Sequence, residues 1–92
     1  MSPETAETIA LQALGWLVAD DSLRDVFMGA TGTSAEDLRT RATDPAFQSS
    51  VLAFLTMDDA WVVAFCDSFG LAYDQPLRAQ YALPGSEAVH WT

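Results

Sequence analysis

Apolar residues recur at three- and four-residue steps along most of the chain, which is the spacing of one face of an α-helix. The clearest stripe follows Ser2 and Pro3, a pair that is typical of a helix start. The stripe consists of Ala6, Ile9, Ala10, Ala13, Trp16 and Leu17. This pattern predicts a first helix from Pro3 to about Ala19.

Paired aspartates and glycines mark the borders of the next helices. A carboxylate at an N-cap accepts hydrogen bonds from free backbone N–H groups, so Asp20-Asp21 and Asp58-Asp59 are each predicted to end one helix and begin another. Glycine tolerates the left-handed conformation that closes a helix, and Gly29, Gly32 and Gly70 are therefore predicted stops. A short second helix is expected before the first two of these glycines.

Two further boundaries lie in the middle of the chain. Residues 34–37 are similar to a capping box and open a predicted third helix that runs through Leu38 to Ala42. Asp44-Pro45 is the strongest boundary, because the residue before proline avoids helical geometry while Asp followed by Pro is a good helix start. The fourth helix is predicted from Pro45 to about Met57.

The fifth predicted helix, about Asp59 to Phe69, is apolar almost all round. A helix of that kind belongs in the centre of a domain. We therefore expect it to be the central element, with only Asp59 and Asp67 clearly reaching solvent. A short sixth helix with apolar positions Leu77, Tyr81 and Ala82 is expected after a loop through residues 74–76, and it should end at residues 83–85.

Signals in the first half of the chain recur in the second half at a fixed spacing. The matched pairs include Leu14 with Leu52, Asp20 with Asp58, Phe27 with Phe65, and Gly32 with Gly70. The pattern predicts two degenerate three-helix repeats, residues 3–44 and 45–84. The alternative is that aspartate caps and glycine stops recur in any helical protein. Both interpretations give an all-α fold, a compact bundle of about six short helices in a single domain, residues 1–84, followed by a C-terminal tail, residues 85–92.

Charge narrows the classes of partner. Half of the 92 residues are apolar, so the chain is expected to fold despite a formal charge of −9. Phosphate repels such a protein at long range, and we therefore expect neither nucleic acid nor an anionic membrane as a partner. The longest apolar run, Ala60 to Cys66, is too short to cross a bilayer, and the N-terminus lacks a signal-peptide pattern. The expected location is cytoplasmic.

Residues that carry chemistry are few and scattered. The single cysteine, Cys66, and the single histidine, His90, cannot supply an internal disulfide or a Cys/His zinc site. Cys66 is expected to be a buried thiol with a raised pKa, and the aspartate pairs are expected to be caps rather than cation ligands. No nucleophile elbow or phosphate-binding glycine loop is present. We therefore expect no enzyme activity, no metal and no cofactor.

Two features exceed what a monomer of this size needs. The apolar stripe of the first helix is too wide for one buried face, and the tail carries a tryptophan beyond the last glycine. The resulting candidate interface residues are Leu11, Gly15, Val18, Val89, His90 and Trp91. They point to an unidentified protein partner or to a homodimer. Burial inside the same chain, with the tail folded back on the core, is the alternative.

Packing and capping positions also carry a resemblance that covers about Pro3 to Gly85. They include Ala6-Glu7, Ile9-Ala10-Leu11, Trp16-Leu17, Leu38-Arg39, Asp44-Pro45, Phe54-Leu55, Phe65-Cys66 and Leu83-Pro84-Gly85. With these residues the chain resembles a family of short alphaproteobacterial proteins, domain of unknown function 3572. The resemblance implies a cytoplasmic bacterial protein and implies no reaction.

The sequence therefore predicts a non-catalytic protein-interaction or regulatory module. The alternative is a small-ligand or enzymatic pocket between the two helical units, because helical bundles also place ligands in their interiors. Its expected lining is Trp16, Phe54, Trp61 and Phe65. A third hypothesis, a nucleic-acid mimic, is disfavoured because charged residues make up only 18% of the chain.

Overall fold

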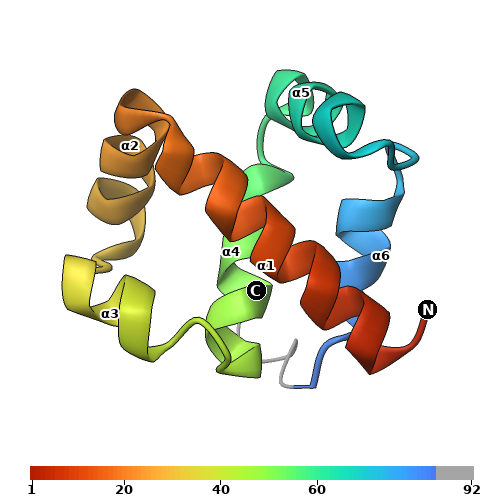
Figure 1. The fold of residues 1–92 in the computed structure, drawn as a ribbon, viewed down its shortest axis with the longest axis horizontal. Coiled ribbons are helices and arrows are strands. Elements are labelled where there is room, and N and C mark those ends of the chain that lie inside the picture. The colour runs from red at the N-terminus through yellow and green to blue at the C-terminus, as the bar shows by residue number, and fades with distance from the viewer. Residues whose placement is uncertain (85–92) are drawn as a thin grey trace.

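The computed structural model describes residues 1–84, and all of the regular structure in that range is α-helical (Figure 1). The helices are α1 (Pro3–Ala19), α2 (Asp21–Thr31), α3 (Ala35–Thr40), α4 (Pro45–Leu55), α5 (Asp59–Phe69) and α6 (Gln75–Ala82). The predicted all-α bundle of six short helices is confirmed. The expectations for residues 85–92 lie outside the described part of the chain.

Most helix ends carry the cap that the sequence predicts. A side-chain oxygen at the N-cap accepts a hydrogen bond from a backbone N–H of the first turn in five helices. These N-caps are Ser2, Asp20, Ser34, Asp44 and Asp58. Gly32 and Gly70 close α2 and α5 in the left-handed conformation, with φ values of 71° and 67°. Local chemistry therefore sets most of the borders.

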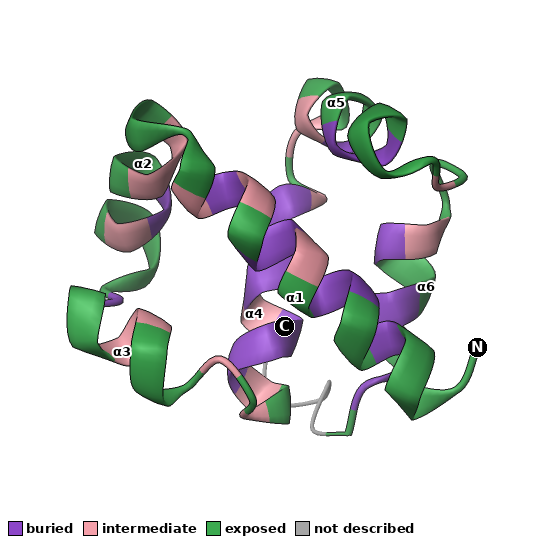
Figure 2. Cartoon of the chain, in the orientation of Figure 1, coloured by how far each residue is buried: buried purple, intermediate pink, exposed green. Residues whose placement is uncertain are grey.

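The core lies where α1, α4 and α6 pack against one another (Figure 2). Ala6, Ala10 and Ala13 of α1 and Ala79 of α6 are all buried, and their small side chains let these helices approach closely. Larger side chains of α1 and α4 fill the remaining space, among them Leu17, Val51, Leu52 and Leu55. Buried residues cover most of α4, so this helix is the centre of the molecule.

Aromatic contacts attach α2 and α5 to this centre. The Phe27 ring of α2 meets the rings of Phe47 and Phe54 edge-on, with centroids 6.2 and 5.2 Å away. Trp61 of α5 stacks on Phe54 at 4.9 Å. Trp16 of α1 meets Phe65 of α5 edge-on at 6.0 Å. Such pairs contribute about 0.5–1.5 kcal/mol each beyond their burial, so both flanking helices are fixed in place.

The expectation that the fifth helix is the central element is wrong. α5 buries only one stripe, Val62, Phe65 and Cys66, while Val63 and Phe69 are 39% and 41% exposed. The physical reason is that α6 occupies the space beside α1 and α4, which leaves α5 at the edge of the bundle (Figure 1). An apolar side chain is permitted at the surface, so its pattern alone does not prove burial.

Smaller differences have local causes. Gly29 lies inside α2 instead of ending it, because Gly32 supplies the left-handed closing residue. α3 ends at Thr40 rather than near Ala42. α4 ends at Leu55 rather than Met57, where the Thr56 hydroxyl donates to carbonyls of the last turn.

The sixth helix also differs from the expectation. It begins at Gln75, within the predicted loop, since Pro76 needs no N–H partner in a first turn. Leu77 and Tyr81, expected on its apolar face, are exposed.

The two halves of the chain share one order of signals but differ in their third helices. Asp20 and Asp58 both cap a helix that a left-handed glycine closes. α3 has no buried residue, whereas α6 belongs to the core. Within residues 1–84, no single helix is long and apolar enough to cross a membrane. α4 and α5 pass that test only together, and they are bent by 112° at their junction.

Candidate functional site

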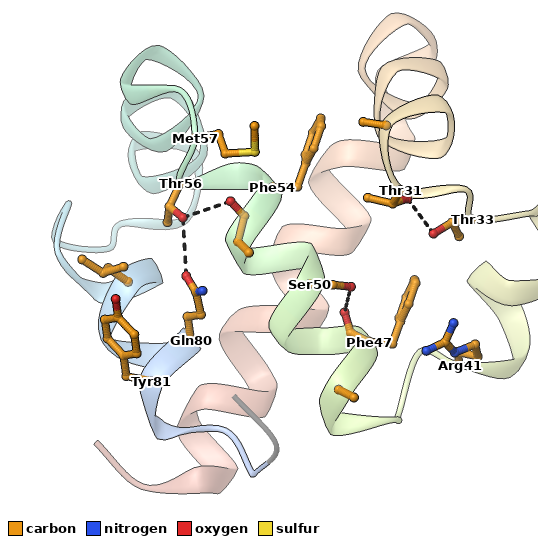
Figure 3. Close-up of a pocket in the computed structure, with 14 residues that line it drawn as sticks. Thr31, Thr33, Arg41, Phe47, Ser50, Phe54, Thr56, Met57, Gln80 and Tyr81 are labelled. Atoms are coloured by element: carbon orange, nitrogen blue, oxygen red, sulfur yellow. Dashed lines mark hydrogen bonds between the residues drawn. The ribbon is translucent and has the colours of Figure 1, made fainter. Parts of the chain in front are cut away.

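A groove of about 880 Å³ runs along α4 on the face turned away from α1 (Figure 3). Its floor is α4, one wall is the end of α2 with the residues around α3, and the other wall is α6. The floor residues are Ala46, Phe47, Ser50, Ala53, Phe54, Thr56 and Met57. The walls are Ala30, Thr31, Thr33 and Arg41 on one side and Leu77, Gln80 and Tyr81 on the other.

The two faces of α4 explain why a groove forms there. Val51, Leu52 and Leu55 are buried in the core, whereas the groove side carries small residues at Ala46, Ser50 and Ala53. Small side chains leave a depression between bulkier walls. The helical part of the floor, from Ala46 to Phe54, extends over about 12 Å at the usual rise of about 1.5 Å per residue, which is enough for about two turns of a docked helix.

Exposed apolar side chains gather along the α6 side of the groove. Met57 is 79% exposed, Tyr81 is 69% exposed and Leu77 is 46% exposed. All three line the groove, and Figure 3 shows Met57 just past the end of α4 and Tyr81 on α6. The fold gains little from side chains that remain in water, and clustered exposure of this kind is typical of a contact surface.

The threonine and serine hydroxyl groups of the groove are paired inside the protein. Thr31 donates to the Phe27 carbonyl at 2.7 Å, and its oxygen lies 2.7 Å from that of Thr33. Ser50 donates to the Phe47 carbonyl at 2.7 Å, and Thr56 donates to the Leu52 carbonyl at 2.9 Å. Their protons are engaged inside the protein, so these groups offer an incoming ligand only acceptor lone pairs beside a largely apolar lining.

The groove has one charged group among the described residues that line it, the guanidinium of Arg41. Its Nη2 lies 3.5 Å from a carboxylate oxygen of Asp44, and its centre lies 5.2 Å from the centroid of the Phe47 ring. The other oxygen of Asp44 accepts from the Ala46 backbone N–H as a helix cap. In a chain with 13 acidic residues, the described lining contains no carboxylate.

Cys66 lies outside the groove and is buried, as the sequence predicts. Its Sγ donates to the Ala72 carbonyl at 3.5 Å. Burial raises the pKa of the thiol, and the nearby carboxylates of Asp67 and Asp74 raise it further. A thiol that keeps its proton is a poor nucleophile. Among residues 1–84, no group of three or more His, Cys, Asp or Glu side chains is placed to hold a metal ion.

The predicted interface residues of the first helix, Leu11, Gly15 and Val18, lie on one face of α1 at positions i, i+4 and i+7, and they differ in exposure. Leu11 is 40% exposed, and an added Cβ at the exposed Gly15 would meet nothing within 4 Å. Val18 is half-buried against the core. Val89, His90 and Trp91 lie outside the described residues. An interface at these positions stays a prediction.

Sequence reasoning missed the α4 groove. The signal that could have found it is the row of small residues at Ala46, Ser50 and Ala53, opposite the large residues of the same helix. The expected pocket between the two units is different, because Trp16, Phe54, Trp61 and Phe65 pack in aromatic pairs. Of these four, only Phe54 lines the groove.

Comparison with known proteins gives a family and no activity. A search of curated proteins and a search of solved structures give no significant match. A family model described as "Protein of unknown function (DUF3572)" matches residues 3–86, which include every residue of the groove described above. The chain therefore belongs to the DUF3572 family.

Proposed function

We propose that this protein is a non-catalytic interaction module that binds an apolar helix of a partner protein in the α4 groove. The observation that carries the proposal is the groove itself, with Met57, Leu77 and Tyr81 exposed near the small floor residues Ala46, Ser50 and Ala53. An amphipathic helix in an apolar groove is a common mode of protein recognition.

Shape and charge define the partner segment. Ala46, Ser50 and Ala53 allow close approach of a second helix along about two turns. The partner helix should be apolar on the docked face, and near Arg41 it should carry a carboxylate. A basic helix is disfavoured because the described lining offers it no acid.

The chemistry of the groove supports binding over catalysis. None of its described lining residues is His, Cys, Asp or Glu, so its hydroxyls have no neighbouring side chain of the usual general-base types there. A small polar metabolite also requires convergent polar groups, and most hydroxyls of this groove are paired with the backbone. We place the module in the cytoplasm as part of the same proposal, because free thiols such as Cys66 are kept reduced there.

Display of random peptides, each long enough for three to four helical turns, tests the proposal with the full chain as bait. We expect enriched sequences with apolar residues at helical spacing and an acidic residue at one end. Ala53→Glu puts a carboxylate on the groove floor and should abolish their binding. Leu11→Glu is the matched control, since it puts the same charge on the exposed face of α1.

Three outcomes would contradict the proposal. Enrichment of no peptide, or enrichment that Ala53→Glu leaves unchanged, removes the groove as the site. Loss of binding in Leu11→Glu alone moves the interface to α1. A saturable rise in melting temperature with a metabolite, but with no peptide, would favour the small-ligand alternative.

A further inference from the structure

We propose that residues 85–92 of the same chain dock in the α4 groove and compete there with the partner helix. The competition rests on the proposed function, whereas the docking itself does not. The proposed contact is intramolecular, and a partner helix must displace residues 85–92 before it can bind. Three properties of the chain support this occupant: where the described part ends, how far the remaining residues reach, and what they contain.

The described chain ends beside the groove. α6 ends at Ala82, and Leu83 is buried directly after it. Tyr81, in the last turn of α6, is a wall residue of the groove. Residues 85–92 reach about 26 Å when extended at about 3.3 Å per residue. This length exceeds the helical floor of the groove, about 12 Å at about 1.5 Å per residue, so the segment is long enough to lie along α4.

The segment matches the groove in chemistry. It contains Val89 and Trp91, which an extended chain places on the same side as Glu87. The only charged group of the described lining is Arg41, and Glu87 is the only acidic side chain of the segment. The segment has no lysine or arginine. Apolar side chains with a single carboxylate are what we infer for the partner helix as well.

The family match adds an independent observation. It ends at residue 86, so the groove lies inside the family region while Val89 and Trp91 lie beyond it. Docking in cis needs little affinity, because a short tether gives an effective concentration on the order of 1 mM. If the contact has a dissociation constant of about 0.1–1 mM, the segment would then occupy the groove in about half to nine-tenths of the molecules.

Fluorine NMR of the full chain labelled with 5-fluorotryptophan tests the docking without any partner. Trp91→Phe identifies the signal of Trp91 among the three tryptophans. We expect this signal to lie away from its position in the urea-unfolded chain, and to move toward that position in Ala53→Glu and in Tyr81→Ala. Leu11→Glu should leave it unchanged. The signal of Trp16, which packs against Phe65, reports in each variant that the fold is intact.

A second measurement uses a synthetic peptide of residues 85–92 as the probe. It should bind the full-length Trp91→Ala variant about 2- to 10-fold more tightly than the natural chain, because the docked fraction masks the site. It should not bind the Trp91→Ala, Ala53→Glu double variant.

The proposal is overturned if the Trp91 signal coincides with that of the unfolded chain, or if it ignores both groove variants. A displacement that disappears on dilution indicates a second copy as the occupant and also overturns it. Failure of the two proposals is distinguishable. If peptide display gives no binder while the Trp91 signal shows docking, only the partner and the competition are refuted. If display gives binders while the Trp91 signal shows no docking, only the docking of residues 85–92 is refuted.

Discussion

Replacing Ser49 of α4 should stabilise the protein, although most substitutions in a core lower the free energy of unfolding. The Ser49 side chain is 0% exposed, and its Oγ has no hydrogen-bond partner among the described residues. A buried hydroxyl without a partner costs about 1–3 kcal/mol relative to water. Ser49→Ala removes that cost and leaves the helix otherwise unchanged.

The expected gain follows from three contributions. Relief of the unpaired hydroxyl is worth about 1–3 kcal/mol, and the higher helix propensity of alanine adds roughly 0.5 kcal/mol. Against these stands the void left by one oxygen atom, which is smaller than a methyl group and costs less than about 1 kcal/mol. Ser49→Ala should therefore raise the free energy of unfolding by about 1–2 kcal/mol. For a domain of this size, each kcal/mol raises Tm by about 4–8 °C.

Ser50→Ala is the matched control, one residue away on the same helix. Its hydroxyl is half-buried and donates to the Phe47 carbonyl at 2.7 Å, so its removal loses about 0.5–1.5 kcal/mol and regains part through propensity. Urea unfolding followed by circular dichroism should rank Ser49→Ala above the natural chain, and the natural chain level with or above Ser50→Ala, at one common m-value. If Ser49→Ala proved less stable than the natural chain, the hydroxyl would have a partner and the reasoning would fail.

Three further predictions concern caps, glycines and pH. Asp58→Ala removes the carboxylate that accepts from the Ala60 N–H at 2.9 Å, and urea unfolding should show a loss of about 1 kcal/mol in stability. Asp59→Ala removes an exposed side chain and should cost less than about 0.5 kcal/mol. Equal losses in the two variants would contradict the cap. Gly70→Ala forces a side chain into a backbone with φ 67° and should lower the free energy of unfolding by about 1–2 kcal/mol. Gly15→Ala, in an open helical position, should raise it by about 0.5–1 kcal/mol. The same sign for both variants would refute the left-handed conformation of Gly70. The pKa of Cys66 is raised in the folded chain by burial, so above pH 9.0, its ordinary value, the unfolded chain loses the thiol proton first and stability falls as pH rises through the folded pKa. That alkaline loss should be shallower in Cys66→Ala, and an identical slope would show that the thiol is not protected.

The sequence predicts what depends on neighbours along the chain and fails where the outcome depends on which helices compete for the same space. Asp20, Asp44 and Asp58 are correct as caps because a capping carboxylate needs only the next two or three backbone N–H groups. The position of α5 is wrong because the space beside α1 and α4 is taken by α6, which no local pattern reveals. The sequence does not predict the groove for the same reason, because Ala53 faces it only as a result of α1 covering the other side of α4.

α4 serves the core with one face and the groove with the other, so the proposed binding of a partner in the groove has a thermodynamic consequence. An isolated helix of eleven residues is not stable in water, so the docking surface exists only while the domain is folded. Under the proposed function, folding and partner binding are linked equilibria. A partner present at a hundred times its dissociation constant adds about 2.7 kcal/mol to the stability of the fold. Core substitutions that loosen α4 should therefore weaken binding without touching the partner.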